Sequence, residues 1–149
     1  MGISPNLEEA MPKGEENLSL LKKICPDHPI HCEIRELKKN LFNIAIAGFD
    51  YFSEFSLFCG LITSFGLDIE SGQIFTSPEP LPGEGRRRIV DLFQVKPVSK
   101  EGFEKNAQSR FIKDLELLIT LLDQNQLARA REEINQRVVQ FLASLASSR

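Results

Sequence analysis

Residues 41–95 contain a change in hydrophobic period that few folds can accommodate. Phe42, Ile44 and Ile46 share one face of residues 42–46, and this period of two is typical of a strand. The period then becomes helical, with apolar positions at Phe55, Phe58, Cys59, Ile62 and Phe65. Residues 67–77 and 88–95 favour strands on either side of a long loop rich in proline and glycine. The stretch therefore predicts strand, helix, strand, strand, and an α+β fold class.

The ends of these elements are also marked in the sequence. Gly66 follows the helical period and predicts a left-handed C-cap, whereas Gly72, inside the next strand, indicates a bulge. Asp50 and Ser53 precede the helix, and either could cap it with a side-chain oxygen. In the last strand Val90 and Leu92 lie on the face opposite to Ile89, Phe93 and Val95, and this second apolar face predicts a covering partner or a second copy.

The flanking segments complete a single domain. Residues 1–14 lack an apolar period and are expected to be a disordered tail, and residues 15–25 predict a short docked helix. Residues 30–37 alternate and predict an edge strand that forms a hairpin with residues 42–47. We expect residues 15–98 to form the core. Residues 99–149 are expected to form helices that pack on it, either two helices separated near Asn125 or one bent helix.

Composition limits the partners that we expect. The 149 residues have a formal net charge of −3, which does not favour nucleic acid as a partner, although Arg86, Arg87 and Arg88 form a local basic run. The acidic N-terminal segment does not resemble a signal peptide, and the sequence has no apolar run of the length of a membrane span. Together with the three cysteines, an odd number, this predicts a cytoplasmic protein with reduced thiols.

Cys25, His28, His31 and Cys32 are the candidate metal ligands, because thiolate and imidazole both bind zinc. The sequence offers no second pair of ligands on a separate element, and Pro26 and Pro29 interrupt the cluster. We therefore favour a helix end, a loop and a strand start over a metal site, and we expect no cofactor.

Several short motifs together resemble a known family. They are Ile44-Ala45-Ile46-Ala47-Gly48-Phe49-Asp50, Phe65-Gly66-Leu67-Asp68-Ile69, Gln73-Ile74-Phe75-Thr76 and Val90-Asp91-Leu92-Phe93-Gln94-Val95. This arrangement resembles the ACT regulatory domain, and within that family the ACT repeats of bacterial uridylyltransferases of the PII nitrogen-signalling protein. The resemblance implies a ferredoxin-like antiparallel sheet with helices on one face, to which this chain adds a helical C-terminal extension. The last strand of the family is missing, and we expect residues 30–37 to take its place at the edge.

The resemblance also implies a ligand site at the first strand-to-helix turn. Asp50 matches the aspartate of the family's Asp-x-Pro-Gly turn, and Tyr51, Phe52 and Ser53 take its other positions. With Asp68 and Glu70 from the second strand, they would line a pocket for a small molecule, completed by a second copy. Residue chemistry alone leaves an alternative, in which Asp50 only caps the helix and Tyr51 and Phe52 belong to the core.

The function expected from these features is a non-catalytic regulatory module that senses an amino acid or a similar small effector. The resemblance implies a role in nitrogen or amino-acid signalling, either alone or attached to a nucleotidyltransferase. The alternative is a protein-interaction or dimerisation module without a small ligand. An enzyme is not favoured, because the sequence contains none of the catalytic motifs of hydrolases, metalloproteases, kinases or nucleotidyltransferases.

Overall fold

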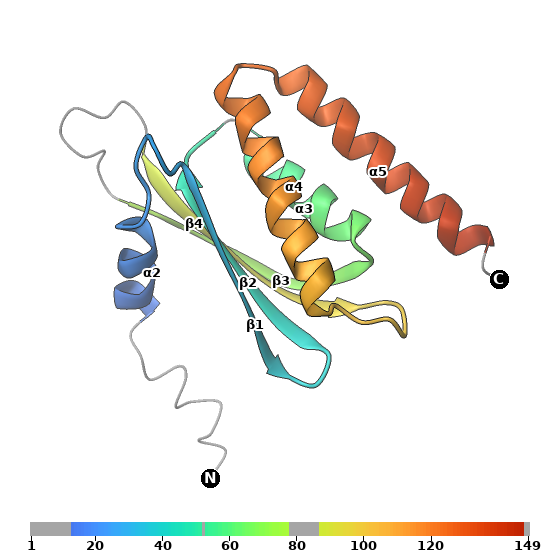
Figure 1. Cartoon of the computed structure of the whole chain (residues 1–149). Helices are drawn as coiled ribbons and strands as arrows, with labels where there is room; N and C mark the ends of the chain where they lie inside the picture. The colour runs from blue at the N-terminus through green and yellow to red at the C-terminus, as the bar shows by residue number, and fades with distance from the viewer. Residues whose placement is uncertain (1–12, 52, 78–86, 148–149) are drawn as a thin grey trace, which may run out of the picture.

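The computed structural model describes residues 13–51, 53–77 and 87–147 (Figure 1). In chain order the described elements are α2 (Lys13–Leu21), β1 (Ile30–Lys38), β2 (Leu41–Phe49), α3 (Glu54–Ser64), β3 (Leu67–Thr76), β4 (Arg88–Pro97), α4 (Lys105–Asp123) and α5 (Leu127–Ser147). The α+β class is confirmed. The expected tail falls largely outside the described residues, and α2 begins within it, at Lys13. No described helix has the length and apolarity needed to cross a membrane.

The four strands form one antiparallel sheet in the order β1-β2-β4-β3, which is compatible with a ferredoxin-like arrangement. β1 occupies the edge beside β2, with Ile34 opposite Ile44, so the expected edge strand at residues 30–37 is confirmed. The hairpin between these strands turns at Asn40, whose φ of 61° is a left-handed conformation that asparagine tolerates. An N-terminal strand thus completes the sheet.

Helices cover both faces of the sheet, and the expectation of helices on one face is therefore wrong. α3 and α4 lie against the face that carries Ile44 and Phe93, whereas α2 lies on the opposite side (Figure 1). Leu20, Leu21 and Ile24 are buried, as are Ala47 and Val90 on the α2 side of the sheet. The apolar surface for which the sequence predicted a partner is thus partly covered by a helix of the same chain.

One glycine expectation is confirmed and the other is wrong. Gly66 follows α3 with φ 76°, and its amide donates to the carbonyl of Thr63 at 2.9 Å, as a left-handed C-cap requires. The irregularity in β3 falls between Ile69 and Ser71 rather than at Gly72. Gly72 instead lies where a Cβ would approach the ring of Phe55 to 3.2 Å, so this glycine is needed for close packing.

The C-terminal segment forms two helices, as one of the two sequence alternatives expected. α4 is anchored to the sheet by aromatic contacts, because Phe103 packs edge-on against both Phe42 and Phe111, with ring centroids 5.5 and 6.2 Å apart. The chain then turns at Asn125, with φ 59°, and α5 returns along the outer side of α3 (Figure 1). α3 is consequently buried between the sheet and α5.

Gly60 allows α5 to lie close to α3. A Cβ built on Gly60 would overlap the Cγ2 atom of Ile134, which is buried on α5. Leu57 and Leu61, which lie outside the apolar stripe expected from the sequence, are buried in the same helix. The contact with α5 therefore widens the buried face of α3.

We expect Gly60→Ala to lower the free energy of unfolding by about 1–2 kcal/mol, although alanine is the better helix former, because overpacking of a tight contact outweighs propensity. Urea unfolding of the single variant and of Gly60→Ala with Ile134→Ala measures the coupling. In the double variant the alanine at position 60 should no longer destabilise. A Gly60→Ala variant more stable than the parent would contradict the close approach.

Candidate functional site

The turn between β2 and α3 contains most of the residues that the sequence predicted as a ligand site. The amide of Asp50 donates to the carbonyl of Arg87 at 2.9 Å, and the Asp50 side chain is exposed. Tyr51 is buried, with 4% of its surface exposed, and Ser53 is half-buried. Phe52 lies outside the described residues. The turn therefore combines an exposed carboxylate with a buried phenol.

Ser53 adopts a left-handed conformation and does not cap α3 with its side chain. Its φ of 65° places it in a region that is unfavourable for residues other than glycine, asparagine and aspartate. Its hydroxyl accepts a hydrogen bond from Nη2 of Arg131 at 3.1 Å. Ser53 thus occupies the N-cap position of α3, but its side chain does not make the expected capping hydrogen bond.

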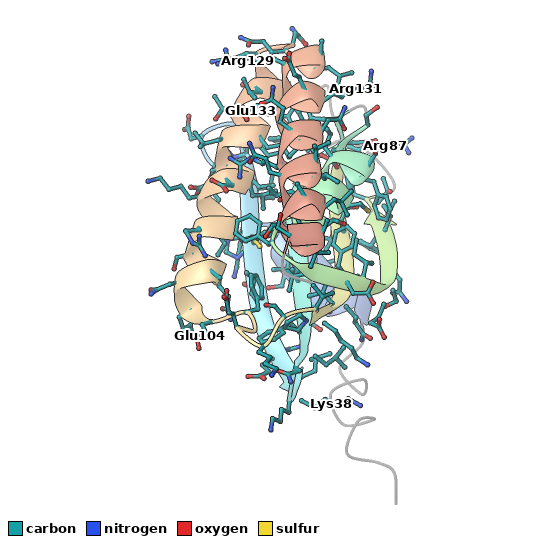
Figure 2. The ribbon with its side chains drawn as sticks, turned by 90° about the vertical axis from the view of Figure 1, so that its right-hand side faces the viewer. Lys38, Arg87, Glu104, Arg129, Arg131 and Glu133 are labelled. Atoms are coloured by element: carbon teal, nitrogen blue, oxygen red, sulfur yellow. The ribbon has the colours of Figure 1, made fainter. Side chains whose placement is uncertain are left out.

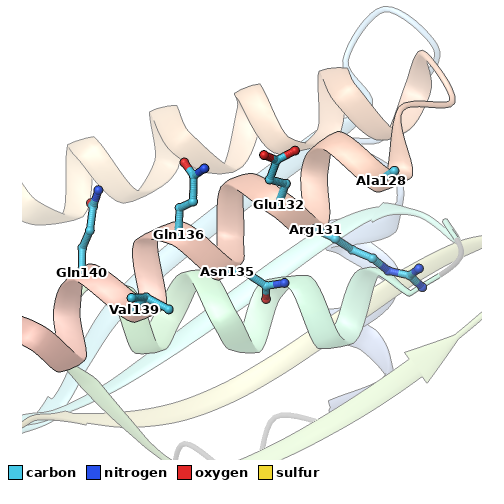
Figure 3. Close-up of a pocket in the computed structure, with 7 residues that line it drawn as sticks. All are labelled: Ala128, Arg131, Glu132, Asn135, Gln136, Val139 and Gln140. Carbon is cyan, nitrogen blue, oxygen red and sulfur yellow. The ribbon is translucent and has the colours of Figure 1, made fainter.

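The corner between α4 and α5 packs over this turn. Oη of Tyr51 donates to Oδ1 of Asp123, the last residue of α4, at 3.1 Å. Arg131 reaches the turn from the first part of α5, and Figure 3 shows its side chain extending toward the start of α3. Figure 2 shows Arg87 and Arg131 at one end of the molecule and Lys38 at the other. Residues more than 70 positions apart therefore meet at the turn.

Asp91 lies below the turn on the central strand β4, opposite Ile46 of β2 and Ile74 of β3. Its side chain is fully buried, and neither carboxylate oxygen has a hydrogen-bond partner. Burial, and secondly the negative charge of Asp50, raise the pKa of the Asp91 carboxyl from 3.8 to about 7. Burial, and secondly the charge of Asp91, raise the pKa of the Cys59 thiol on α3. Buried polar groups without partners are rare in folded proteins, so Asp91 requires an explanation.

The structure does not bring Asp68 to the turn. Asp68 pairs with Lys96 near the start of β3, whereas the turn follows the end of β2, where Phe49 pairs with Arg88. Eight residues of β4 separate the two levels, or about 25 Å at the usual rise of a strand. The physical reason is the crossover, because α3 returns the chain to the far end of the sheet before β3 begins. One protomer therefore does not combine Asp68 with Asp50.

The cysteine and histidine cluster is not arranged as a metal site. Cys25 and His28 are joined through their backbones by two hydrogen bonds, and Nε2 of His31 lies 2.9 Å from Oε2 of Glu33. Cys32 is directed to the other face of β1, and its burial raises the pKa of its thiol to about 12. Within the described ranges, no three histidine, cysteine or acidic side chains are placed to hold a metal ion.

The arginine run does not form one basic patch. Arg88 is buried, its Nε donates to the carbonyl of Ile24 at 3.0 Å, and its guanidinium lies 5.8 Å from the centre of the Phe49 ring. Arg87 is exposed, and Arg86 lies outside the described residues. Arg88 thus binds the segment that follows α2 to the sheet.

Comparison with known proteins adds no family to this description. No protein-family model matches the chain, and the search of curated proteins finds no match.

Sequence reasoning missed three residues that the structure places at or below the turn. Asp123 and Arg131 are distant in sequence, and no motif indicated their contacts. Asp91 did carry a signal, because it shares a face of β4 with Phe93 and Val95, which are both fully buried. An acidic residue in the middle of an apolar face marks either an exposed position or an unusual buried one, and the structure shows the second.

We expect Asp91→Asn to remove a pH dependence of stability between about pH 4 and pH 7. The folded state holds the Asp91 proton up to about pH 7, whereas the unfolded chain loses it near 3.8. The folded state therefore binds more protons in this window, and the stability of the parent falls as pH rises through it. Each pKa unit corresponds to about 1.4 kcal/mol, so the difference between parent and variant should change by several kcal/mol.

Urea unfolding at intervals from pH 4 to pH 8 measures this difference, with the exposed Asp68→Asn as the matched control. The control should follow the parent at every pH. If the free energy of unfolding varied with pH in the same way for the parent and for Asp91→Asn, this would contradict a buried, unpaired carboxyl at position 91.

We expect Ser53→Gly to be more stable than Ser53→Ala by about 1 kcal/mol. Both substitutions remove the hydroxyl that Arg131 contacts, but only glycine adopts a φ of 65° without steric cost. The comparison therefore isolates the backbone strain from the lost hydrogen bond. Equal unfolding midpoints in urea for the two variants would show that residue 53 is not left-handed in solution.

Proposed function

We propose that this chain is an ACT-like, non-catalytic regulatory module that binds an amino acid or a similar small effector at the turn formed by Asp50, Tyr51 and Ser53. The role would lie in nitrogen or amino-acid signalling, with the module acting alone or attached to a nucleotidyltransferase. The strand order supports the proposal, because β1 stands at the edge that the family's last strand would occupy. The left-handed Ser53 supports it further, since this residue matches the glycine of the family's turn.

The observation that carries the proposal is the unpaired carboxyl of Asp91 below that turn. A carboxylate without a partner in an apolar environment is strongly attracted to a cation, and a raised pKa combined with burial is typical of functional sites. An effector with an ammonium group would pair with Asp91 and satisfy its oxygens. Asp50, on the exposed side of the turn, would strengthen the same preference for a cationic group. The effector class that fits this charge is an amine or an amino acid.

A panel of the twenty free amino acids, glutamine included, tests the proposal by thermal unfolding of the chain. A ligand that binds only the folded state and is present at about 100 times its dissociation constant stabilises by about 2.7 kcal/mol, or roughly 5–10 °C in a domain of this size. Asp91→Asn should abolish the shift while remaining folded. Asp68→Asn is the matched control, about 16 Å away along the sheet because five residues of β4 separate the level of Asp68 from Asp91, and it should retain the shift.

The second candidate function, an interaction or dimerisation module, is favoured by the outer surface of α5. Val139, Leu142 and Leu145 are exposed by 63, 54 and 42%, and no charged residue occurs between Val138 and Ser147. A shallow groove of about 600 Å³ also runs along this helix, lined in part by Arg131, Asn135 and Val139 (Figure 3). No shift with any amino acid, together with a solution mass of two chains, would favour this function over effector binding.

A further inference from the structure

Two hydrogen bonds join the turn to the C-terminal helices, and we call these two bonds the corner latch. In one bond the hydroxyl of Tyr51 donates to Asp123, and in the other the guanidinium of Arg131 donates to Ser53, both at 3.1 Å. One bond involves the end of α4 and the other the beginning of α5. Both therefore hold the turn against the same corner.

The corner itself is tightly connected. The amide of Asn125 donates to the carbonyl of Leu122 at 3.1 Å, and the amide of Gln126 donates to the carbonyl of Leu121 at 2.9 Å. With Asn125 in a left-handed conformation, these bonds fix the path between α4 and α5. The latch is therefore attached to a corner whose backbone is held by hydrogen bonds.

α5 has few fully buried residues. Among its described residues only Ala130 and Ile134 are fully buried, and both lie in the first half of the helix, near the corner. Ile134 packs on Gly60, and Arg137 pairs with Asp114 of α4 at 2.7 Å. Residues 142–147 are exposed throughout. The fully buried residues of α5 therefore lie in the half that carries the latch, whereas the half-buried Phe141 packs near Gly66 in the other half.

The latch and Asp91 lie toward the same end of the sheet, because Asp91 is three residues from Arg88, which pairs with the last residue of β2. The Asp91 side chain has no exposed surface, and the buried Tyr51 stands in the turn at the end of the neighbouring strand β2. The hydroxyl bond to Asp123 holds Tyr51 in this position. An effector that reached Asp91 through the turn would therefore have to open the latch.

We propose that the corner latch couples the effector site to α5, so that an effector with an ammonium group opens the latch and loosens α5 from α3. This inference rests on the proposed function for its effector, but the coupling between turn and helix is a property of the chain alone. Release of α5 would uncover Leu57 and Leu61 of α3 as well as the inner side of α5. The regulated output is thus the exposure of the α3–α5 interface.

Hydrogen exchange of the full chain, measured by mass spectrometry, tests the coupling without any ligand. Tyr51→Phe and Arg131→Ala each remove one bond of the latch and should speed exchange in α5 by roughly three- to tenfold, because an undocked helix of this length is only marginally stable in water. Exchange in β2 and β4 should remain as in the parent. That pattern distinguishes release of α5 from general destabilisation.

Arg129→Ala is the matched control. Arg129 lies in the same turn of α5, contacts Gln126 rather than the β2–α3 turn, and stands on the other side of the helix from Arg131 (Figure 2). The rate of hydrogen exchange in α5 of the Arg129→Ala variant should equal that of the parent. Unchanged α5 exchange in both latch variants, or equal acceleration in the control, would overturn the coupling.

The amino-acid panel, applied to the double variant Tyr51→Phe with Arg131→Ala, tests the regulation. Loss of the latch should increase the population of the open state that binds the effector. The apparent affinity for the effector then rises by the same factor as that population. Any amino acid that stabilises the parent should therefore bind the double variant several-fold more tightly, and equal affinity would overturn the regulatory role. If no amino acid binds either protein, the proposed effector fails, while the exchange measurement still decides whether the latch holds α5.

Discussion

The close approach of α5 to α3 at Gly60 is the contact on which the rest of the structure depends. Because glycine lacks a side chain, Ile134 packs directly against the backbone of α3, and the helix becomes buried on both sides. The direction of α5 then follows, and with it the position of the corner that reaches the turn through Asp123 and Arg131. A small residue in the middle of a helix therefore determines which residues surround the β2–α3 turn, two helical turns away.

The buried carboxyl of Asp91 is the main departure from an otherwise consistent core. Its neighbours on the same face of β4, Phe93 and Val95, are fully buried, and its opposite residue on β2 is Ile46. A carboxyl in such a position is stable mainly as the neutral acid, which is why its pKa is raised to about 7. Near physiological pH both charge states are therefore populated, and a cationic partner would shift the balance toward the ionised form.

The local hydrophobic pattern predicted the helices and strands well, but it predicted poorly which other elements pack against them. The alternation in residues 30–37 and 42–46 gave both strands of the first hairpin and their pairing, because a period of two specifies a face. The helical stripe gave α3, but it missed Leu57 and Leu61, since nothing local indicated that α5 would cover a second side. For the same reason α2 was expected only as a docked helix, and its place on the opposite face of the sheet was not foreseen. Of the candidate site, Asp50, Tyr51 and Ser53 do lie together because they are adjacent in sequence, whereas Asp68 does not join them.

The sequence by itself determined the α+β class, the edge strand at residues 30–37, the left-handed Gly66 and the helical character of the C-terminal segment, because each depends on residues within a few positions of one another. Only the tertiary structure decided that helices cover both faces, that Asp68 and the turn lie at opposite ends of the sheet, and that Asp123 and Arg131 close over the turn. The burial of Asp91 without a partner belongs to the same group. These features arise from contacts between elements far apart in the chain, whose relative position follows from packing rather than from any local period.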